Sequence, residues 1–228
     1  MNSLHIFGAN NLIAEAISTN SICQNIFLYS RIEPLYSTVF DLKQKKFSYI
    51  RCDYSSGWAS NFDFTNPPEG ENTFIFLQSP FPNKLLIKTS EEEINQDIDT
   101  GLIFNIKVTK KILTVKPNDC NFIFFSSVLA TRGSMGSVLY GTIKSGLEGF
   151  SRNIAAEYGR LGTRSNVIKL GYLDSGYALK LKNEVRDTYK KNNFLKSSVD
   201  LTSIIHSINF LHEAKSVTGS VLNIDCGL

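Results

Sequence analysis

The chain has 228 residues, which is long enough for one domain with a full hydrophobic core. Hydrophobic residues make up 42% and charged residues 20%, as in ordinary globular proteins, so the composition argues against disorder. The net charge is only +3 and the basic residues are scattered, which argues against a surface for nucleic acid.

The sequence carries no signal for a membrane, an export route or a metal. Its apolar runs are far shorter than the ~20 residues of a membrane helix, and its first residues lack the pattern of a signal peptide. The four cysteines lie far apart, without C-x-x-C spacing: Cys23, Cys52, Cys120 and Cys226. We therefore expect reduced thiols in a cytoplasmic protein with no metal and no nucleic-acid or membrane partner.

Short apolar runs recur along the chain and predict strands. They lie at residues 4–7, 25–29, 47–51, 74–77, 121–125, 166–170 and 221–224. Runs that are apolar on both faces are typical of parallel strands covered by helices on both sides of a sheet. We therefore expect a single domain over residues 1–228 with an α/β, Rossmann-like, doubly wound parallel sheet.

Helical signals separate these runs. Apolar residues 12, 13, 16 and 17 share one face after Gly8. Ser90 can cap a helix that runs toward Leu113, because Glu93 stands at the capping-box position. Residues 140–158 form a third helical stretch. Residues 55–72 contain two prolines and two glycines, which predicts a loop where a crossover helix could be expected.

Tyr140 and Lys144 are the most informative pair of residues. Four residues apart on a helix, the phenol and the ammonium share one face. A nearby cation favours the phenolate, which would let the tyrosine exchange a proton near neutral pH. Ser127 ends a predicted strand, and its hydroxyl could hold a substrate oxygen beside the tyrosine. Taken alone, the pair is a weak signal, because a half-buried aromatic ring and a solvated lysine are the commoner explanation of such spacing.

The wider pattern resembles the short-chain dehydrogenase/reductase family. Ser127, Tyr140 thirteen residues later and Lys144 are similar to that family's S-x12-Y-x3-K arrangement. Residues 164–175 resemble its strand and P-G-x-x-x-T segment, and residues 217–227 resemble its closing T-G-x-x-x-x-x-D-G-G. The resemblance covers nearly the whole chain and implies an oxidoreductase acting on a carbonyl/alcohol pair.

The resemblance also implies roles for the catalytic residues. Ser127 would orient the carbonyl, Tyr140 would be the acid/base, and Lys144 would lower the tyrosine pKa and hold the nicotinamide ribose. Many members add an asparagine on the preceding helix, which anchors a water in the proton relay. Asp99, 28 residues before Ser127, takes that position here. An ordinary helix aspartate unrelated to the chemistry is the alternative.

The expected glycine-rich loop, T-G-x-x-x-G-x-G, is altered at two of its three glycines. Gly8 is kept, whereas Leu12 and Ala14 replace the second and third glycines. A side chain at Leu12 would crowd the backbone approach to a pyrophosphate, so a loop that no longer binds a dinucleotide is an alternative. If the loop binds the cofactor, the resemblance places these residues beside it: Gly8, Asn10, Asn11 and Ile13.

Four further residues are expected at the cofactor. Ser30 and Arg31 follow the second strand, where an arginine suits the 2'-phosphate of NADP better than the free hydroxyl of NAD. Asp53 matches the family aspartate that bonds the adenine amino group. The family's N-N-A-G has become 77–80, Leu-Gln-Ser-Pro, and Gln78 could offer an amide at the second asparagine's place.

The cofactor site would be closed by Gly171, Leu173 and Ser175, and residues 176–196 would form a lid over the substrate. The lid is rich in lysine and arginine, which suits either an acidic substrate or a solvated helix. Because no hydrophobic lid is evident, we expect a small polar substrate. By the resemblance, the protein would be a homodimer or homotetramer.

The sequence therefore favours an NADP(H)-dependent oxidoreductase that interconverts a carbonyl and an alcohol. Two alternatives stay open. One is a non-catalytic subunit or binding protein on the same fold that partners an active dehydrogenase. The other is a lyase, epimerase or dehydratase that keeps a bound nucleotide.

Overall fold

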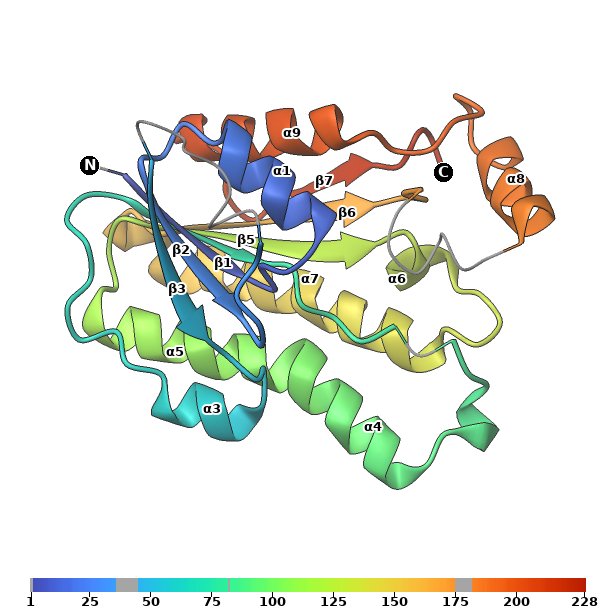
Figure 1. The fold of residues 1–228 in the computed structure, drawn as a ribbon, viewed down its shortest axis with the longest axis horizontal. Coiled ribbons are helices and arrows are strands. Elements are labelled where there is room, and N and C mark those ends of the chain that lie inside the picture. Colours follow the sequence, from blue (N-terminus) through green and yellow to red (C-terminus); the bar gives the residue numbers. More distant parts are fainter. Residues whose placement is uncertain (1, 36–44, 82, 175–181) are drawn as a thin grey trace.

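The fold is described from a computed structural model, and the description covers residues 2–35, 45–81, 83–174 and 182–228. Figure 1 shows a parallel sheet with helices on both faces. The strand order is β3-β2-β1-β4-β5-β6-β7. The strands are β1 (Ser3–Phe7), β2 (Asn25–Ser30), β3 (Lys46–Arg51), β4 (Asn72–Phe76), β5 (Cys120–Ser127), β6 (Arg164–Leu170) and β7 (Val221–Ile224). Every expected strand is confirmed, with ends shifted by two residues at most.

The helices divide between the two faces of the sheet. They are α1 (Leu12–Asn20), α3 (Ser56–Asn61), α4 (Glu91–Ile98), α5 (Phe104–Val115), α6 (Leu129–Arg132), α7 (Val138–Tyr158), α8 (Asn183–Lys191) and α9 (Leu201–Glu213). Short helical turns are η1 (Leu86–Lys88), η2 (Asp99–Ile103) and η3 (Gly159–Leu161). Helices α1 and α9 cover one face, whereas α3, α5 and α7 cover the other (Figure 1). Among the described residues, none of these helices combines the length and apolar character needed to cross a membrane.

Two hydrophobic clusters hold the layers together, one on each face of the sheet. Successive residues of β4 alternate between them: Phe74 and Phe76 belong to the α5–α7 side, and Ile75 to the α1–α9 side. This explains why the strands are apolar at nearly every position. The α5–α7 side is rich in aromatic rings, and Phe7 stacks between Tyr29 at 4.2 Å and Phe76 at 4.8 Å.

The helical run after Ser90 begins as the sequence predicts. The Ser90 hydroxyl accepts from the Glu93 N–H, and the Glu93 carboxylate accepts from the Ser90 N–H. The run continues to Val115 but is interrupted at η2 by a π-helical turn, in which the Phe104 N–H bonds to the Asp99 carbonyl five residues earlier. Such turns insert one extra residue into a helix and often lie at functional sites.

The crossover between β3 and β4 corrects one expectation. Residues 55–72 were expected to form a loop, but Ser56–Asn61 form α3. The Ser55 hydroxyl caps this helix by accepting from the Trp58 N–H. The Trp58 ring stacks on Phe62 and Phe104, so aromatic packing holds the helix against α5 in spite of its weak local propensity.

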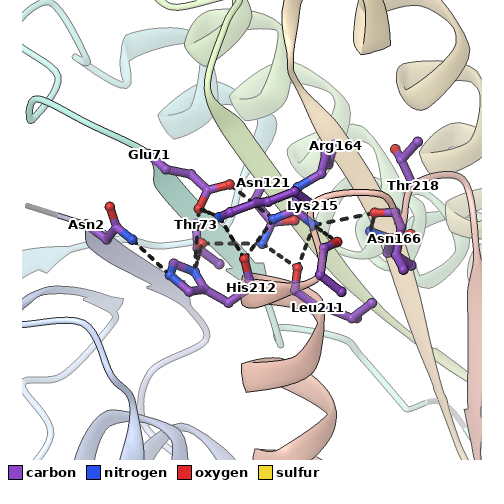
Figure 2. Close-up of polar contacts among 12 residues, drawn as sticks. Asn2, Glu71, Thr73, Asn121, Arg164, Asn166, Leu211, His212, Lys215 and Thr218 are labelled. Carbon is purple, nitrogen blue, oxygen red and sulfur yellow. Dashed lines mark hydrogen bonds and ion pairs between the residues drawn. The ribbon is translucent and has the colours of Figure 1, made fainter.

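A buried polar cluster closes the amino-terminal edge of the sheet (Figure 2). Arg164, at the start of β6, donates to the Leu211 and His212 carbonyls at the end of α9, at 2.6 and 3.1 Å. It also pairs with Glu71 at 3.0 Å, and Lys215 contacts the same carboxylate. These donors satisfy carbonyls that the end of a helix leaves unpaired, so the cluster joins α9 to the sheet.

The strand order reverses between β1 and β4, which lie side by side in register. In doubly wound sheets, the carboxyl ends of the strands at such a switch point open a crevice for a ligand. Gly8 follows β1 and Leu77 follows β4, so both lie at this crevice.

Candidate active site

The three residues of the expected catalytic set lie together. Ser127 ends β5, and Tyr140 and Lys144 lie on α7, which packs against β5 and β6. The Ser127 side chain hydrogen bonds to the Tyr140 side chain. The Phe81 ring covers Tyr140 edge-on, with the ring centres 4.7 Å apart. The fold therefore brings the serine and the tyrosine into direct contact.

The protonation of Tyr140 and Lys144 is governed by burial. The Lys144 side chain donates to the Phe125 carbonyl at 2.7 Å, and burial lowers its pKa to about 7. Burial also raises the pKa of Tyr140 to about 12, although the bond from Ser127 acts in the opposite direction. We expected Lys144 to lower the tyrosine pKa, but in this arrangement burial outweighs that effect. Burial therefore favours the protonated phenol of Tyr140.

A second buried network lies beneath α7. The Ser126 hydroxyl donates to the Glu148 carboxylate at 2.7 Å, and Lys169 of β6 pairs with the same oxygen at 3.1 Å. Ser126 also donates to the Lys144 carbonyl at 3.4 Å. This network joins α7 to β5 and β6 one helical turn after Lys144. The sequence analysis did not find it, because its three members are far apart in the chain.

A cleft of about 510 Å³ opens at the β1/β4 switch point. Six expected cofactor residues line it: Gly8, Asn10, Asn11, Ser30, Arg31 and Gln78. Tyr54, Gln96, Asp97 and Thr100 also line it and were not expected. Residues 77–80 form part of the wall, and the next residue, Phe81, covers Tyr140. The cleft therefore adjoins the catalytic set.

Gly8 and Asn11 shape the loop between β1 and α1. Gly8 has a φ of +87°, and a Cβ there would lie 2.6 Å from the Gln78 backbone nitrogen. The Asn11 side chain caps α1 by accepting from the Ala14 N–H and donating to the Gly8 carbonyl. Leu12 is half exposed and does not line the cleft. The crowding that we expected from its side chain is therefore not seen.

Arg31 reaches the cleft from the end of β2. Its guanidinium lies 5.7 Å from the centre of the Tyr54 ring, and it donates to the Asp53 carbonyl at 3.5 Å. The Asp53 carboxylate accepts from the Ser55 N–H and hydroxyl and does not line the cleft. The neighbouring Tyr54 occupies that wall instead. Ser30 is buried and donates to the Ile32 carbonyl.

Asp99 and Ile13 lie elsewhere than expected. The Asp99 carboxylate accepts from the Ser56 N–H at 2.7 Å, so its recorded bond is to the start of α3 and not to Tyr140. Ile13 packs into the core on the α1 side and does not line the cleft.

The segment after β6 carries the remaining expected residues. Gly171 donates to the Ile224 carbonyl at 2.9 Å, and a Cβ on it would lie 2.6 Å from Asp225 Cα. Leu173 forms a β-bridge with Val199. Ser175 and residues 176–181 of the expected lid lie outside the described residues.

The described part of the lid contains α8, which is linked to the end of β6. Arg186 and Lys190 of α8 both pair with Asp174, at 2.5 and 3.0 Å. The Tyr172 and Tyr189 rings stack with centres 5.3 Å apart. These contacts hold the exposed, basic α8 beside the Gly171 segment.

The site contains features that fit a dinucleotide. Gly8 provides a close backbone approach that a Cβ would fill, and Arg31 supplies a cation in the same cleft. Gln78 is also part of the cleft wall, and among the described residues its buried side-chain oxygen has no hydrogen-bond partner. A doubly wound sheet with such a cleft at its switch point defines a Rossmann-like α/β protein.

Comparison with known proteins identifies the family. Residues 76–228 match the profile of a family described as enoyl-(acyl carrier protein) reductase. The chain therefore belongs to the short-chain dehydrogenase/reductase family.

Curated relatives include the 3-oxoacyl-[acyl-carrier-protein] reductase of Mus musculus, which is 30% identical over 147 residues. Carbonyl reductase family member 4 of Xenopus tropicalis is 30% identical over 146 residues. These matches cover 64% and 63% of this chain, and 61% of each relative. The chain thus spans less than two thirds of the length of these relatives.

Solved structures agree with the fold. An NADP-bound structure from Agrobacterium tumefaciens, assigned as a 2-deoxy-d-gluconate 3-dehydrogenase, has a TM-score of 0.89 at 19% identity. The match covers 99% of this chain and 95% of that one. A glucose/ribitol dehydrogenase structure from Brucella melitensis has a TM-score of 0.85 at 20% identity, with 99% and 96% covered. At these identities the likeness concerns the fold.

Proposed function

We propose that this protein is an NADP(H)-dependent oxidoreductase that interconverts a carbonyl and an alcohol. The observation that carries the proposal is the contact between Ser127 and Tyr140, with Lys144 one helical turn away, beside the cleft at the β1/β4 switch point. The relatives named as reductases support the same reaction class.

Each residue of the set has a distinct task. The nicotinamide supplies or accepts the hydride when bound. Ser127 holds the substrate oxygen, and Tyr140 gives its proton to that oxygen in the reductive direction. Lys144, with a pKa of about 7, can then supply a proton to replace the one that Tyr140 has given up at physiological pH. The π-turn and the network of Ser126, Glu148 and Lys169 hold α7 in position.

The choice of NADP rests on Arg31. A guanidinium presents several donors to a phosphate and suits the 2'-phosphate, which NAD lacks. The group lies over the Tyr54 ring at the cleft wall, so it can face a ligand without entering the core.

The substrate is proposed to be a small polar carbonyl compound, because the described lid helix α8 is exposed and basic. A second candidate is a 3-oxoacyl group, the substrate in the name of the mouse relative. Exposed apolar side chains at the edge of the site favour it: Phe81, Leu85, Met135 and Val138. A homo-oligomer in the cytoplasm completes the proposal, and its mass in solution would check the assembly.

Fluorescence titration with NADPH and NADH tests the cofactor. We expect the wild type to bind NADPH. Arg31→Ala should weaken NADPH binding about tenfold or more and should change NADH binding little. Arg51→Ala is the matched control, since Arg51 is exposed at the end of the adjacent strand β3 and lies outside this cleft. If the folded wild type binds neither nucleotide, the proposal is wrong and a non-catalytic subunit becomes the better explanation.

A further inference from the structure

Gln78 belongs to a chain of buried amides that begins on helix α5. Asn105 of α5 donates its side-chain N–H to the Gly101 carbonyl at 2.7 Å. Gln78 then donates its side-chain N–H to the Asn105 side-chain oxygen at 2.6 Å. Asn105 is fully buried, and Gln78 is 7% exposed.

The direction of these bonds fixes which end of Gln78 faces away from Asn105. A backbone carbonyl can only accept, so the amide nitrogen of Asn105 must point at Gly101. Its oxygen must then point at Gln78 and can be satisfied only by a donor, which is the Gln78 nitrogen. The Gln78 oxygen is therefore directed away from this chain.

That oxygen is buried, and no residue that the structure describes supplies it with a hydrogen bond. Burying an acceptor without a partner carries a cost, so such groups are rare and usually have a partner that binds there. Gln78 lines the cleft beside Gly8, whose positive φ and missing Cβ bring the two backbones together. Because Gln78 is a residue of the cleft wall, a donor on a ligand in the cleft can supply the missing partner of this oxygen.

The helix carrying Asn105 is held close by the π-turn. A Cβ on Gly101 would lie 2.7 Å from Ile143 of α7 and 3.4 Å from Pro80 of the cleft wall. The glycine permits this close approach, which places the amide chain between the cleft and the catalytic helix.

We propose that Gln78 presents its side-chain oxygen to a hydrogen-bond donor of the bound dinucleotide, and that Asn105 is the positioning residue that fixes this orientation. The inference rests on the proposed function. The proposal assigns different groups of the dinucleotide to Arg31 and to Gln78. Phosphate oxygens cannot donate and belong with Arg31, whereas a hydroxyl, such as those of the ribose rings, belongs with Gln78.

The test measures the Kd of NADPH by nicotinamide fluorescence for Gln78→Leu, Asn105→Leu, the double variant and one control. We expect Gln78→Leu to weaken binding about 5- to 10-fold, as the loss of one buried neutral hydrogen bond does. Gln24→Leu is the matched control and should stay within about twofold, because Gln24 is exposed just before β2 and does not line the cleft. Thermal unfolding without nucleotide checks each fold, and Gln78→Met or Asn105→Ser replaces any variant that does not fold.

The positioning role requires a double-mutant cycle. Asn105→Leu should weaken the binding of NADPH, although Asn105 does not line the cleft. In the Gln78→Leu background, the same change should cause little further loss of affinity. Additive effects would show that Asn105 acts independently and would overturn its role. Wild-type affinity in Gln78→Leu would overturn the inference alone, whereas a folded wild type that binds no nucleotide would overturn the proposed function together with it.

Discussion

The Lys144 side-chain nitrogen lies 5.5 Å from the centre of the Tyr140 ring and donates to the backbone carbonyl of Phe125 at 2.7 Å. The lysine therefore connects the catalytic helix to the strand that carries Ser127. Burial opposes the charged form of both side chains, lowering the pKa of the ammonium and raising that of the phenol. The charged forms of both side chains are therefore costly in the folded protein.

Replacing Lys144 should stabilise the fold while removing activity. Between pH 7 and its ordinary pKa of 10.5, the unfolded chain holds a proton on Lys144 that the folded chain lacks. Stability therefore rises with pH across this window, and the cost of burial is greatest below pH 7. Lys144→Met should gain roughly 2–4 kcal/mol at pH 6 and less near pH 10.

Urea unfolding at several pH values measures this gain. Lys110→Met, at an exposed position of α5, is the control and should show no such dependence. A Lys144→Met variant that is less stable than the wild type at pH 6 would contradict the role of burial.

Tyr140→Phe should keep the fold and the cofactor but lose catalysis. The phenyl ring retains the packing against Phe81, whereas the proton donor is gone. We expect kcat to fall by about 10²–10⁴, with NADPH affinity nearly unchanged. The assay follows NADPH oxidation in a screen of polar carbonyl compounds and 3-oxoacyl thioesters. Unchanged turnover in the variant would exclude Tyr140 as the acid.

Arg164 should be essential for stability and not for chemistry. It is buried at the edge opposite the cleft and holds both Glu71 and the end of α9 (Figure 2). Arg164→Leu removes a buried donor from the Glu71 carboxylate and from the carbonyls at the end of α9, and it should cost about 3–5 kcal/mol in the free energy of unfolding. Lys215→Met is the control, because Lys215 contacts the same carboxylate but its side chain is 59% exposed. Equal effects of the two changes would show that burial does not decide the contribution.

The ion pair of Glu148 and Lys169 should matter mainly when half of it is removed. The two side chains are 12% and 10% exposed, so Lys169→Leu alone leaves a buried carboxylate and should cost about 3–5 kcal/mol. The double change Glu148→Leu with Lys169→Leu should stay within about 1–2 kcal/mol of the wild type. Chemical denaturation measures the free energy of unfolding of the wild type, Lys169→Leu and the double variant. A double variant that is less stable than Lys169→Leu would refute this account.

The sequence by itself determined the strands of this protein and which residues are the candidates for its catalytic set. Apolar runs of strand length, the Ser90–Glu93 capping box and the spacing of Ser127, Tyr140 and Lys144 are local patterns, and local backbone geometry follows from them. The same patterns also located Gly8 and Arg31 at the cleft, because each directly follows a strand.

Only the tertiary structure decided which distant side chains meet. Asp99 bonds to the start of α3 and Asn105 meets Gln78, and neither contact follows from a spacing along the chain. Likewise, Lys169 meets Glu148 only because β6 lies beneath α7. Contacts of this kind depend on how the layers pack, since a partner on another element has no fixed separation along the chain.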